Sequence, residues 1–271
     1  MRYLIKRPAP IFLLLLLCTC NKQKPSEHVN EKESIPYLNI SYIDEYPHDT
    51  DAFTEGLLFH KGKLFESTGA TSLPQTRSLF GEVNLETGKI EVKVELDREK
   101  YFGEGITFLN GRVFQLTYKS RTGFVYDEQT YQKIREFTIP SKEGWGLTTN
   151  GSILIMSDGT DKLTFLDPIS LSVSKEIYVK ENDYAVHNLN ELEYVDGYIY
   201  ANVWMTNEII KIDSKDGKVV GRIDLTSYVK DAKNSFHDSL EMNGIAYNPE
   251  RESFFITGKL WPKIYEIKTE M

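Results

Sequence analysis

Cysteine is scarce in this 271-residue chain, with only Cys18 and Cys20 present. Both lie among the first twenty residues, so the remainder excludes an internal disulfide, a cysteine-rich metal site and a cysteine nucleophile. Apolar runs are short as well: the main one, Ile11 to Leu17, does not reach the length of a membrane-spanning helix. Helical periodicity of useful length is missing throughout, so we expect no helices of note.

Positive charge is also limited. The chain has 32 Lys and Arg against 40 Asp and Glu, a net charge of −8, and shows no basic cluster in the region expected to fold. Because phosphate binding draws on clustered Lys and Arg, nucleic acid is not an expected partner. Aromatic residues, by contrast, are plentiful. Sixteen Tyr and fourteen Phe favour strands, where broad rings pack on a pleated surface.

The N-terminal segment has the features of an export signal, because Arg2, Lys6 and Arg7 precede the apolar run. The run ends in Leu17-Cys18-Thr19-Cys20, which resembles a bacterial lipoprotein cleavage box with Cys20 as the lipidated residue. An unmodified signal peptide with two incidental cysteines is the alternative.

We therefore predict an exported protein of the bacterial periplasm or cell envelope, held at the membrane only by a lipid on Cys20. Residues 1–20 form the signal in this interpretation. The polar residues 21–36 form a flexible tether, and residues 37–271 form one folded domain.

Five similar segments recur along the domain. They are Phe53-Thr54-Glu55-Gly56-Leu57, Phe102-Gly103-Glu104-Gly105-Ile106, Gly144-Trp145-Gly146-Leu147, Leu189-Asn190-Glu191-Leu192-Glu193 and Met242-Asn243-Gly244-Ile245-Ala246. Their first residues lie 42 to 53 positions apart, close to the ~40 to 50 residues of a four-stranded propeller blade. Each segment is expected to open one blade.

Four strands are predicted within the second repeat, over residues 106–109, 113–118, 122–126 and 134–138. The first two are joined by Asn110-Gly111, a pair that favours a tight hairpin turn. The sequence thus predicts an all-β, five-bladed propeller. A β-sandwich is the rival, but it rarely reaches ~230 residues and would not repeat five openings.

The fifth repeat is one strand short, since only residues 263–268 remain for its third strand. A fourth strand is needed to cover the sheet edge. Residues 38–46 alternate apolar and polar side chains and precede the first repeat. We predict that they close the ring as the outer strand of the last blade.

Several segments closely resemble the signature sequences of the plant and bacterial glutamine cyclotransferases, in order from about residue 46 to the C-terminus. Besides the five openings they are Phe65-Glu66-Ser67-Thr68-Gly69, Asn202-Val203-Trp204 and Thr257-Gly258-Lys259-Leu260-Trp261-Pro262. The resemblance implies a five-bladed propeller and an aminoacyltransferase that converts the N-terminal glutamine of peptides and proteins to pyroglutamate with release of ammonia. It also implies a reaction without metal or cofactor.

Cyclisation requires a group that takes a proton from the attacking amine and gives one to the leaving nitrogen. Glu104 is the candidate, because Gly103 and Gly105 on either side let other segments and the substrate approach closely. The resemblance also implies that this glutamate is the catalytic acid. Read in isolation, it would be a surface turn residue.

Aromatic residues at the openings are predicted to line the substrate pocket. Trp145 and Trp204 resemble the family's active-site aromatics and would exclude water, which raises the pKa of a neighbouring acid. Phe53 and Phe102 are expected in the same pocket. Tyr118 stands where the family commonly has tryptophan. Core packing is the alternative for these rings.

Glu55 departs from the resemblance, because the best-known relatives carry glutamine there. We expect it to form a coupled pair with Glu104 and to hold the substrate's ammonium group, unless it is placed differently. Asn190 is predicted to bind the substrate backbone or carboxamide. Lys259 is predicted to stabilise negative charge on the oxygen or on Glu104, with a solvated strand-end cation as the alternative.

Other patterns are weak. His48, His187 and His237 lack the spacing of metal ligands, and residues 158–161 are typical of a turn rather than a calcium loop. Two alternative functions stay open. One is a non-catalytic, lipid-anchored propeller that binds peptides or envelope proteins. The other is a metal-dependent lactonase-like enzyme using Glu55, Glu104, Asn190 and Asn243.

Overall fold

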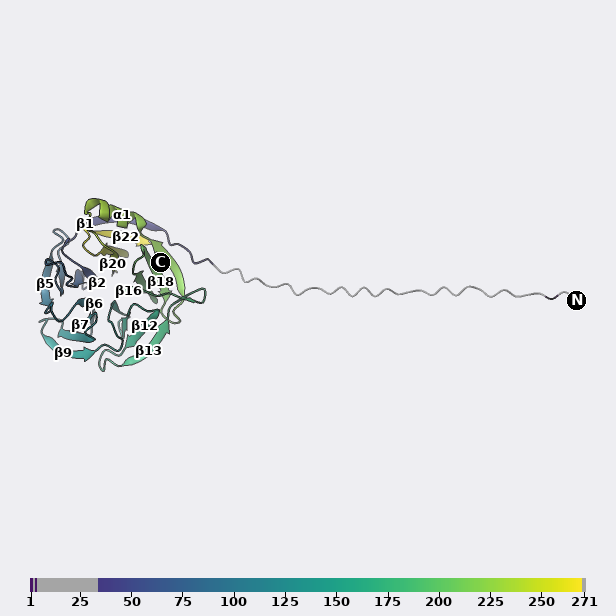
Figure 1. Cartoon of the computed structure of the whole chain (residues 1–271), viewed down its shortest axis with the longest axis horizontal. Helices are drawn as coiled ribbons and strands as arrows, with labels where there is room; N and C mark the ends of the chain where they lie inside the picture. The colour runs from purple at the N-terminus through teal and green to yellow at the C-terminus, as the bar shows by residue number, and fades with distance from the viewer. Residues whose placement is uncertain (2, 4–33, 270–271) are drawn as a thin grey trace. The chain divides into compact units, whose positions relative to one another are not determined.

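The computed structural model describes residues 1, 3 and 34–269. The cleavage box around Cys20 and the predicted tether up to residue 33 lie outside the described residues. Within residues 34–269, five four-stranded antiparallel sheets are arranged around a common axis (Figure 1). The predicted five-bladed propeller is confirmed.

Each blade is built from consecutive strands, innermost first. Blade 1 contains β2 (Thr54–His60), β3 (Lys63–Thr68), β4 (Leu79–Val83) and β5 (Ile90–Glu95). Blade 2 contains β6 (Gly103–Leu109), β7 (Arg112–Thr117), β8 (Thr122–Asp127) and β9 (Lys133–Thr138). Blade 3 contains β10 (Leu147–Thr149), β11 (Leu154–Met156), β12 (Lys162–Leu166) and β13 (Val173–Tyr178). Blade 4 contains β16 (Leu189–Val195), β17 (Tyr198–Val203), β18 (Glu208–Asp213) and β19 (Val219–Asp224).

Blade 5 is closed by the N-terminal strand, as predicted. It contains β20 (Met242–Asn248), β21 (Ser253–Gly258), β22 (Lys263–Thr269) and β1 (Ile40–Pro47). The strands β1 and β22 run antiparallel, with Ile40 opposite Thr269 and Pro47 opposite Lys263. The first and last described strands therefore seal the ring side by side (Figure 1).

Burial falls from the axis outward, and this explains the sequence pattern of each blade. All seven residues of the innermost strand β6 are buried, whereas the outermost strand β9 has no buried residue. Innermost strands carry apolar and small residues on both faces because neighbouring blades cover them. The predicted Asn110-Gly111 hairpin is confirmed, with φ of 53° and 75° at the two residues, as a type I′ turn requires.

A buried ion pair stabilises the seam where blade 5 meets blade 1. His48 Nε2 lies 3.1 Å from both carboxylate oxygens of Glu66, and neither side chain is exposed. The ring's Nδ1–H donates to the Trp261 carbonyl at 2.7 Å, and the Thr54 hydroxyl donates to Glu66 at 2.7 Å. His48 is thus a core histidine that joins segments from both ends of the chain.

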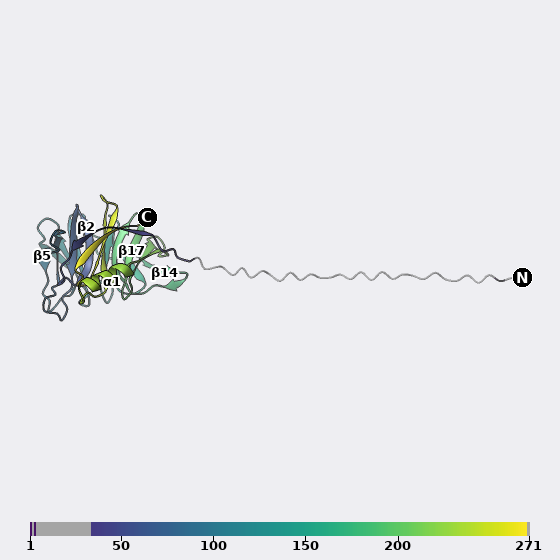
Figure 2. The same ribbon diagram turned by 90° about the horizontal axis from the view of Figure 1, so that it is seen from above.

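The expectation that the domain has no helix is wrong at one place. The connection from blade 4 to blade 5 contains the helix α1 (Thr226–Ser235), which lies across the outside of the strands (Figure 2). Only Val229 and Ala232 of this helix are buried, so its apolar face is too narrow to produce a clear helical pattern. No helix in residues 34–269 is long and apolar enough to cross a membrane.

A second unpredicted element lies in the connection from blade 3 to blade 4. It is a short hairpin of β14 (Lys180–Glu181) and β15 (Tyr184–Ala185), joined at Asn182 and Asp183 with positive φ.

Candidate active site

The repeated openings are irregularities at the start of the innermost strands. In blades 1, 2, 4 and 5 the pairing of the first two strands shifts register there: between Thr54 and Gly56, Gly103 and Ile106, Leu189 and Leu192, and Met242 and Ile245. A bulge of this kind changes the direction of side chains at a strand end. The polar residues inside the four irregularities are Glu55, Glu104, Asn190, Glu191 and Asn243, and all five are buried.

Backbone contacts between blades hold Glu104 in place. The Gly105 N–H donates to the Trp145 carbonyl of blade 3 at 2.9 Å, and a Cβ at Gly105 would lie only 2.4 Å from the Leu147 nitrogen. On the other side, the Ser67 hydroxyl of blade 1 donates to the Glu104 carbonyl at 2.6 Å. The glycine beside Glu104 is therefore required by the close approach of the next blade, as the sequence predicted.

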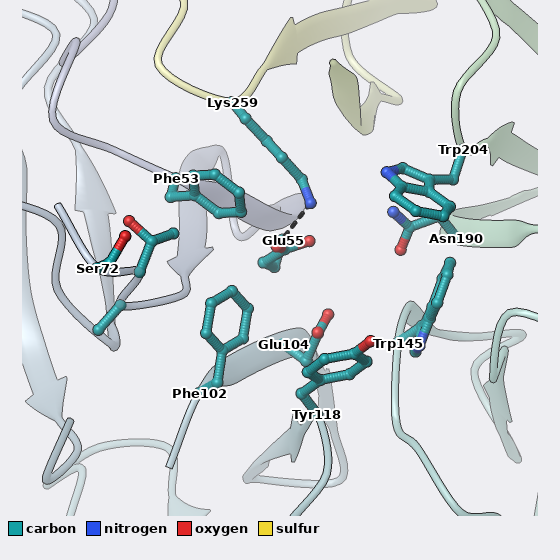
Figure 3. Close-up of a pocket in the computed structure, with 12 residues that line it drawn as sticks. Phe53, Glu55, Ser72, Phe102, Glu104, Tyr118, Trp145, Asn190, Trp204 and Lys259 are labelled. Carbon is teal, nitrogen blue, oxygen red and sulfur yellow. Dashed lines mark hydrogen bonds and ion pairs between the residues drawn. The ribbon is translucent and has the colours of Figure 1, made fainter. Parts of the chain in front are cut away.

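The innermost strands begin around a cavity of about 360 Å³. It is lined by all nine residues predicted to form the site, namely Phe53, Glu55, Phe102, Glu104, Tyr118, Trp145, Asn190, Trp204 and Lys259 (Figure 3). Their chemical roles stay predictions. Sequence reasoning missed Ala70, Thr71 and Ser72, which also line the cavity. They follow β3 in a loop of small residues that carries no recognisable chemical pattern.

Five aromatic rings form a continuous arc around the cavity. Phe53 contacts Phe102 edge-on with ring centres 5.9 Å apart, and Phe102 lies 5.9 Å from Tyr118. Tyr118 lies 6.4 Å from Trp145, which contacts Trp204 edge-on at 5.8 Å. Tyr118 thus occupies its place in the arc with a smaller ring than tryptophan. The arc gives the cavity a largely apolar wall.

Glu104 lies inside this wall, not on the surface. Its exposure is 4%, and its Oε2 has no hydrogen-bond partner among the described residues. Burial raises the pKa of this carboxyl well above its usual range, and the nearby charge of Glu55 raises it further. The environment of Glu104 therefore favours its protonated form, and Figure 3 shows the carboxyl pointing between Glu55 and Trp145.

Glu55 forms an ion pair with Lys259. Lys259 Nζ donates to Glu55 Oε1 at 2.8 Å, and the Asn243 amide donates to Oε2 at 3.0 Å. Burial raises the pKa of Glu55 to about 7 against the lowering effect of Lys259. Lys259 lies 4.5 Å above the Phe53 ring and is 7% exposed, so it is not a solvated strand-end cation.

Comparison of the sequence and the fold with known proteins identifies the family of this chain. The family model described as glutamine cyclotransferase matches residues 12–269. The chain belongs to this family. It is 42% identical to a glutaminyl-peptide cyclotransferase of Arabidopsis thaliana over 231 residues, covering 84% of this chain and 71% of the relative. The crystal structure of Myxococcus xanthus glutaminyl cyclase matches with a TM-score of 0.79 and 33% identity, covering 88% of this chain and 99% of that one.

Asn190 supplies a second polar atom without a hydrogen-bond partner among the described residues that line the candidate active-site cavity. Its Oδ1 is buried without a hydrogen-bond partner among the described residues, while its own carbonyl accepts from the Ser157 hydroxyl at 2.7 Å. Buried polar atoms are nearly always satisfied in the working state of a protein. Asn190 Oδ1 and Glu104 Oε2 therefore mark where a bound molecule would place its N–H groups.

Glu191 has a structural role that the sequence did not reveal. Its Oε1 accepts the Leu57 N–H of blade 1 at 3.3 Å, and its Oε2 accepts the Ile245 N–H of blade 5 at 2.7 Å. Burial raises its pKa well above the usual range. The neighbouring residue on the same strand face, Glu193, similarly accepts the Tyr247 N–H at 2.8 Å. These carboxyls connect innermost strands across the axis and do not line the cavity.

The raised pKa of Glu104 predicts a pH-dependent stability. As pH rises above 4.5, the unfolded chain releases this proton while the folded chain retains it, so folding loses stability up to the folded-state pKa. In Glu104→Gln the side chain does not ionise, so this pH-dependent loss of folding stability is absent. We expect its unfolding midpoint, measured by calorimetry, to rise relative to the parent by at least about 2 °C between pH 5 and pH 8.

The exposed Glu136, whose side chain is 46% accessible, provides the control. Glu136→Gln should keep a constant difference from the parent over the same range. A constant difference for Glu104→Gln as well would show that Glu104 ionises normally in the folded protein.

Proposed function

We propose that this chain is a glutaminyl-peptide cyclotransferase in which Glu104 moves the protons. It converts the N-terminal glutamine of a peptide or protein to pyroglutamate and releases ammonia. The observation that carries the proposal is the buried, unpartnered carboxyl of Glu104, which faces an aromatic cavity in a member of the glutamine cyclotransferase family.

The cavity suits a glutamine side chain. Rings on one side pack against its aliphatic carbons, and the unpartnered Asn190 Oδ1 accepts an N–H from its carboxamide or α-amine. The reaction joins two groups of one residue, so holding that residue in a folded conformation supplies most of the required proximity. An apolar wall with a few convergent polar atoms is the usual form of a small-ligand site.

Ring closure begins when the neutral α-amine attacks the side-chain carbonyl carbon and forms the new C–N bond. Negative charge develops on the carbonyl oxygen, where the ammonium of Lys259 stabilises it. Glu104 gives its proton to the departing nitrogen and receives one from the attacking nitrogen. The old C–N bond breaks, ammonia leaves, and Glu104 returns to its protonated state.

Glu55 acts in this scheme through Lys259. Both of its oxygens already accept hydrogen bonds, from Lys259 and Asn243, so its geometry suits holding the lysine more than the substrate's amine. Its charge also raises the pKa of Glu104, in addition to the larger effect of burial. The lactonase alternative would place a cation among the same side chains, where the Lys259 ammonium already supplies the positive charge beside Glu55.

The proposed role of Glu104 predicts a large loss of activity in Glu104→Gln. We expect turnover of a glutamine-initiated dipeptide, followed by ammonia release, to fall about 10²- to 10⁴-fold while circular dichroism stays unchanged. Addition of EDTA should leave the parent rate unaffected. The exposed Glu136→Gln serves as the matched control and should keep full activity.

Three outcomes would contradict this scheme. Near-normal turnover in Glu104→Gln would remove Glu104 from the mechanism. Loss of the parent's activity in EDTA would favour the metal-dependent alternative, and absence of turnover in the parent would favour a binding scaffold.

Glu55→Gln predicts a displaced pH profile. Its charge raises the pKa of Glu104, and Lys259 lowers it. The variant lacks the negative charge of Glu55 but keeps the positive charge of Lys259, so the pKa of Glu104 falls. The acidic limb of kcat/KM follows the substrate's α-amine near a pKa of about 7.7 to 8.0. The alkaline limb should move to lower pH in Glu55→Gln, narrowing the profile, and an unchanged or upward-shifted limb would contradict the coupling.

We also propose that the protein is exported and held in the bacterial envelope by a lipid on Cys20. Support comes from the sequence alone, in the basic N-terminus, the apolar run and the cleavage box. Metabolic labelling with radioactive palmitate should mark the parent and Cys18→Ser. Cys20→Ser should lose the label, and label retained there, or absent from the parent, would contradict the anchor.

A further inference from the structure

A second cavity lies beside the first, near the seam of blades 5 and 1. Its volume is about 480 Å³. It is formed by segments that precede β2, follow β3, follow α1 and follow β21. These connections lie on the face of the ring where the innermost strands begin, which is also the face of the candidate active site.

The two cavities share their wall. Ser72 and Lys259 line the first cavity, and the residues that directly follow them, Leu73 and Leu260, line the second. Because consecutive Cα atoms are about 3.8 Å apart, the wall is only one residue thick. We expect a peptide whose first residue fills the active-site cavity to bring its second or third residue near the other cavity.

The loop that contributes to this wall is held in a single shape. The Thr71 N–H donates to the Thr76 hydroxyl at 2.8 Å, and that hydroxyl donates to the Leu73 carbonyl at 2.8 Å. The Arg98 guanidinium donates to the carbonyls of Thr71 at 2.8 Å and Pro74 at 3.2 Å. A preformed wall of this kind reduces the entropy lost when a ligand binds.

The second cavity combines an apolar lining with acidic groups. Its apolar residues are Leu73, Phe236, Leu240 and Leu260. Asp51 and Asp238 also line it, while no lysine or arginine of residues 34–269 does. The one basic ring, His237, is fully exposed and lies 3.3 Å from Asp238. A long side chain with an aliphatic stem and a cationic head matches this arrangement, because its stem packs on the apolar residues while its head stays near carboxylates and water.

We propose that this second cavity is a specificity subsite for an arginine or lysine side chain at the second or third position of the substrate. The proposal rests on the function proposed above, since it concerns peptides whose N-terminal glutamine occupies the first cavity. Such a subsite would make the enzyme select among glutamine-initiated chains according to the residue at their second or third position.

The test compares peptides that differ only in the head group. Two series, Gln-Xaa-Ala and Gln-Ala-Xaa, carry arginine, its neutral isostere citrulline, or glutamate at Xaa. In at least one series we expect kcat/KM for arginine to exceed that for citrulline by about fivefold, with glutamate lower still. The preference should shrink as ionic strength is raised.

Two variants test whether the preference for arginine depends on the carboxylates of the second cavity. In the double variant Asp51→Asn, Asp238→Asn the arginine-to-citrulline ratio should fall to less than about twofold. Asp216→Asn removes one charge from the turn between β18 and β19, on the opposite face of the ring, and should leave the ratio and the rates unchanged.

Each remaining outcome overturns the subsite. Equal kcat/KM for the arginine and citrulline peptides in both series would contradict the subsite, and so would an arginine-to-citrulline ratio that is unchanged in the double variant. In either case, normal turnover of glutaminyl-alanine would still support the proposed activity. Failure of glutaminyl-alanine itself to react would overturn that activity and the subsite with it.

Discussion

Close approach of the five innermost strands is the constraint on which the site depends. Around the axis, neighbouring blades meet backbone to backbone, as where a Cβ at Gly146 would lie 2.2 Å from the Asn190 carbonyl. Such contacts leave no space for water between blades and require glycine at the crossing points. The strand openings at these close contacts carry Glu55, Glu104 and Asn190, which meet in one cavity.

This arrangement places charge where water cannot screen it. Glu55 is stabilised by Lys259 and Asn243, while Glu104 has no such partner at Oε2 among the described residues, and its pKa is raised well above the usual range. The environments of the two carboxyls in one cavity thus differ because their partners differ. The aromatic arc contributes by keeping the surroundings dry, and the proposed chemistry uses the contrast between the two groups.

Much of the fold could be predicted, because five similar openings, four of them with a register shift, leave a repeated sequence pattern. Asn-Gly pairs also mark hairpins such as 110–111. The ring-closing strand followed from a missing fourth strand in the last blade. The helix α1 could not be predicted, since only Val229 and Ala232 anchor it. The resemblance supplied the cavity residues, yet the partners of Glu55 depend on contacts between segments 204 residues apart, which local patterns do not record.

Ring closure by β1 also has a consequence for synthesis. Its partner β22 ends at Thr269, so the ribosome must have made all the other strands of the ring before the last blade is complete. Until then β1 has no strand to pair with, and β1 and β21 each present an open edge to other chains. Closure of the ring is thus a late event in synthesis, and a chain that stops before β22 would leave a ring that cannot close.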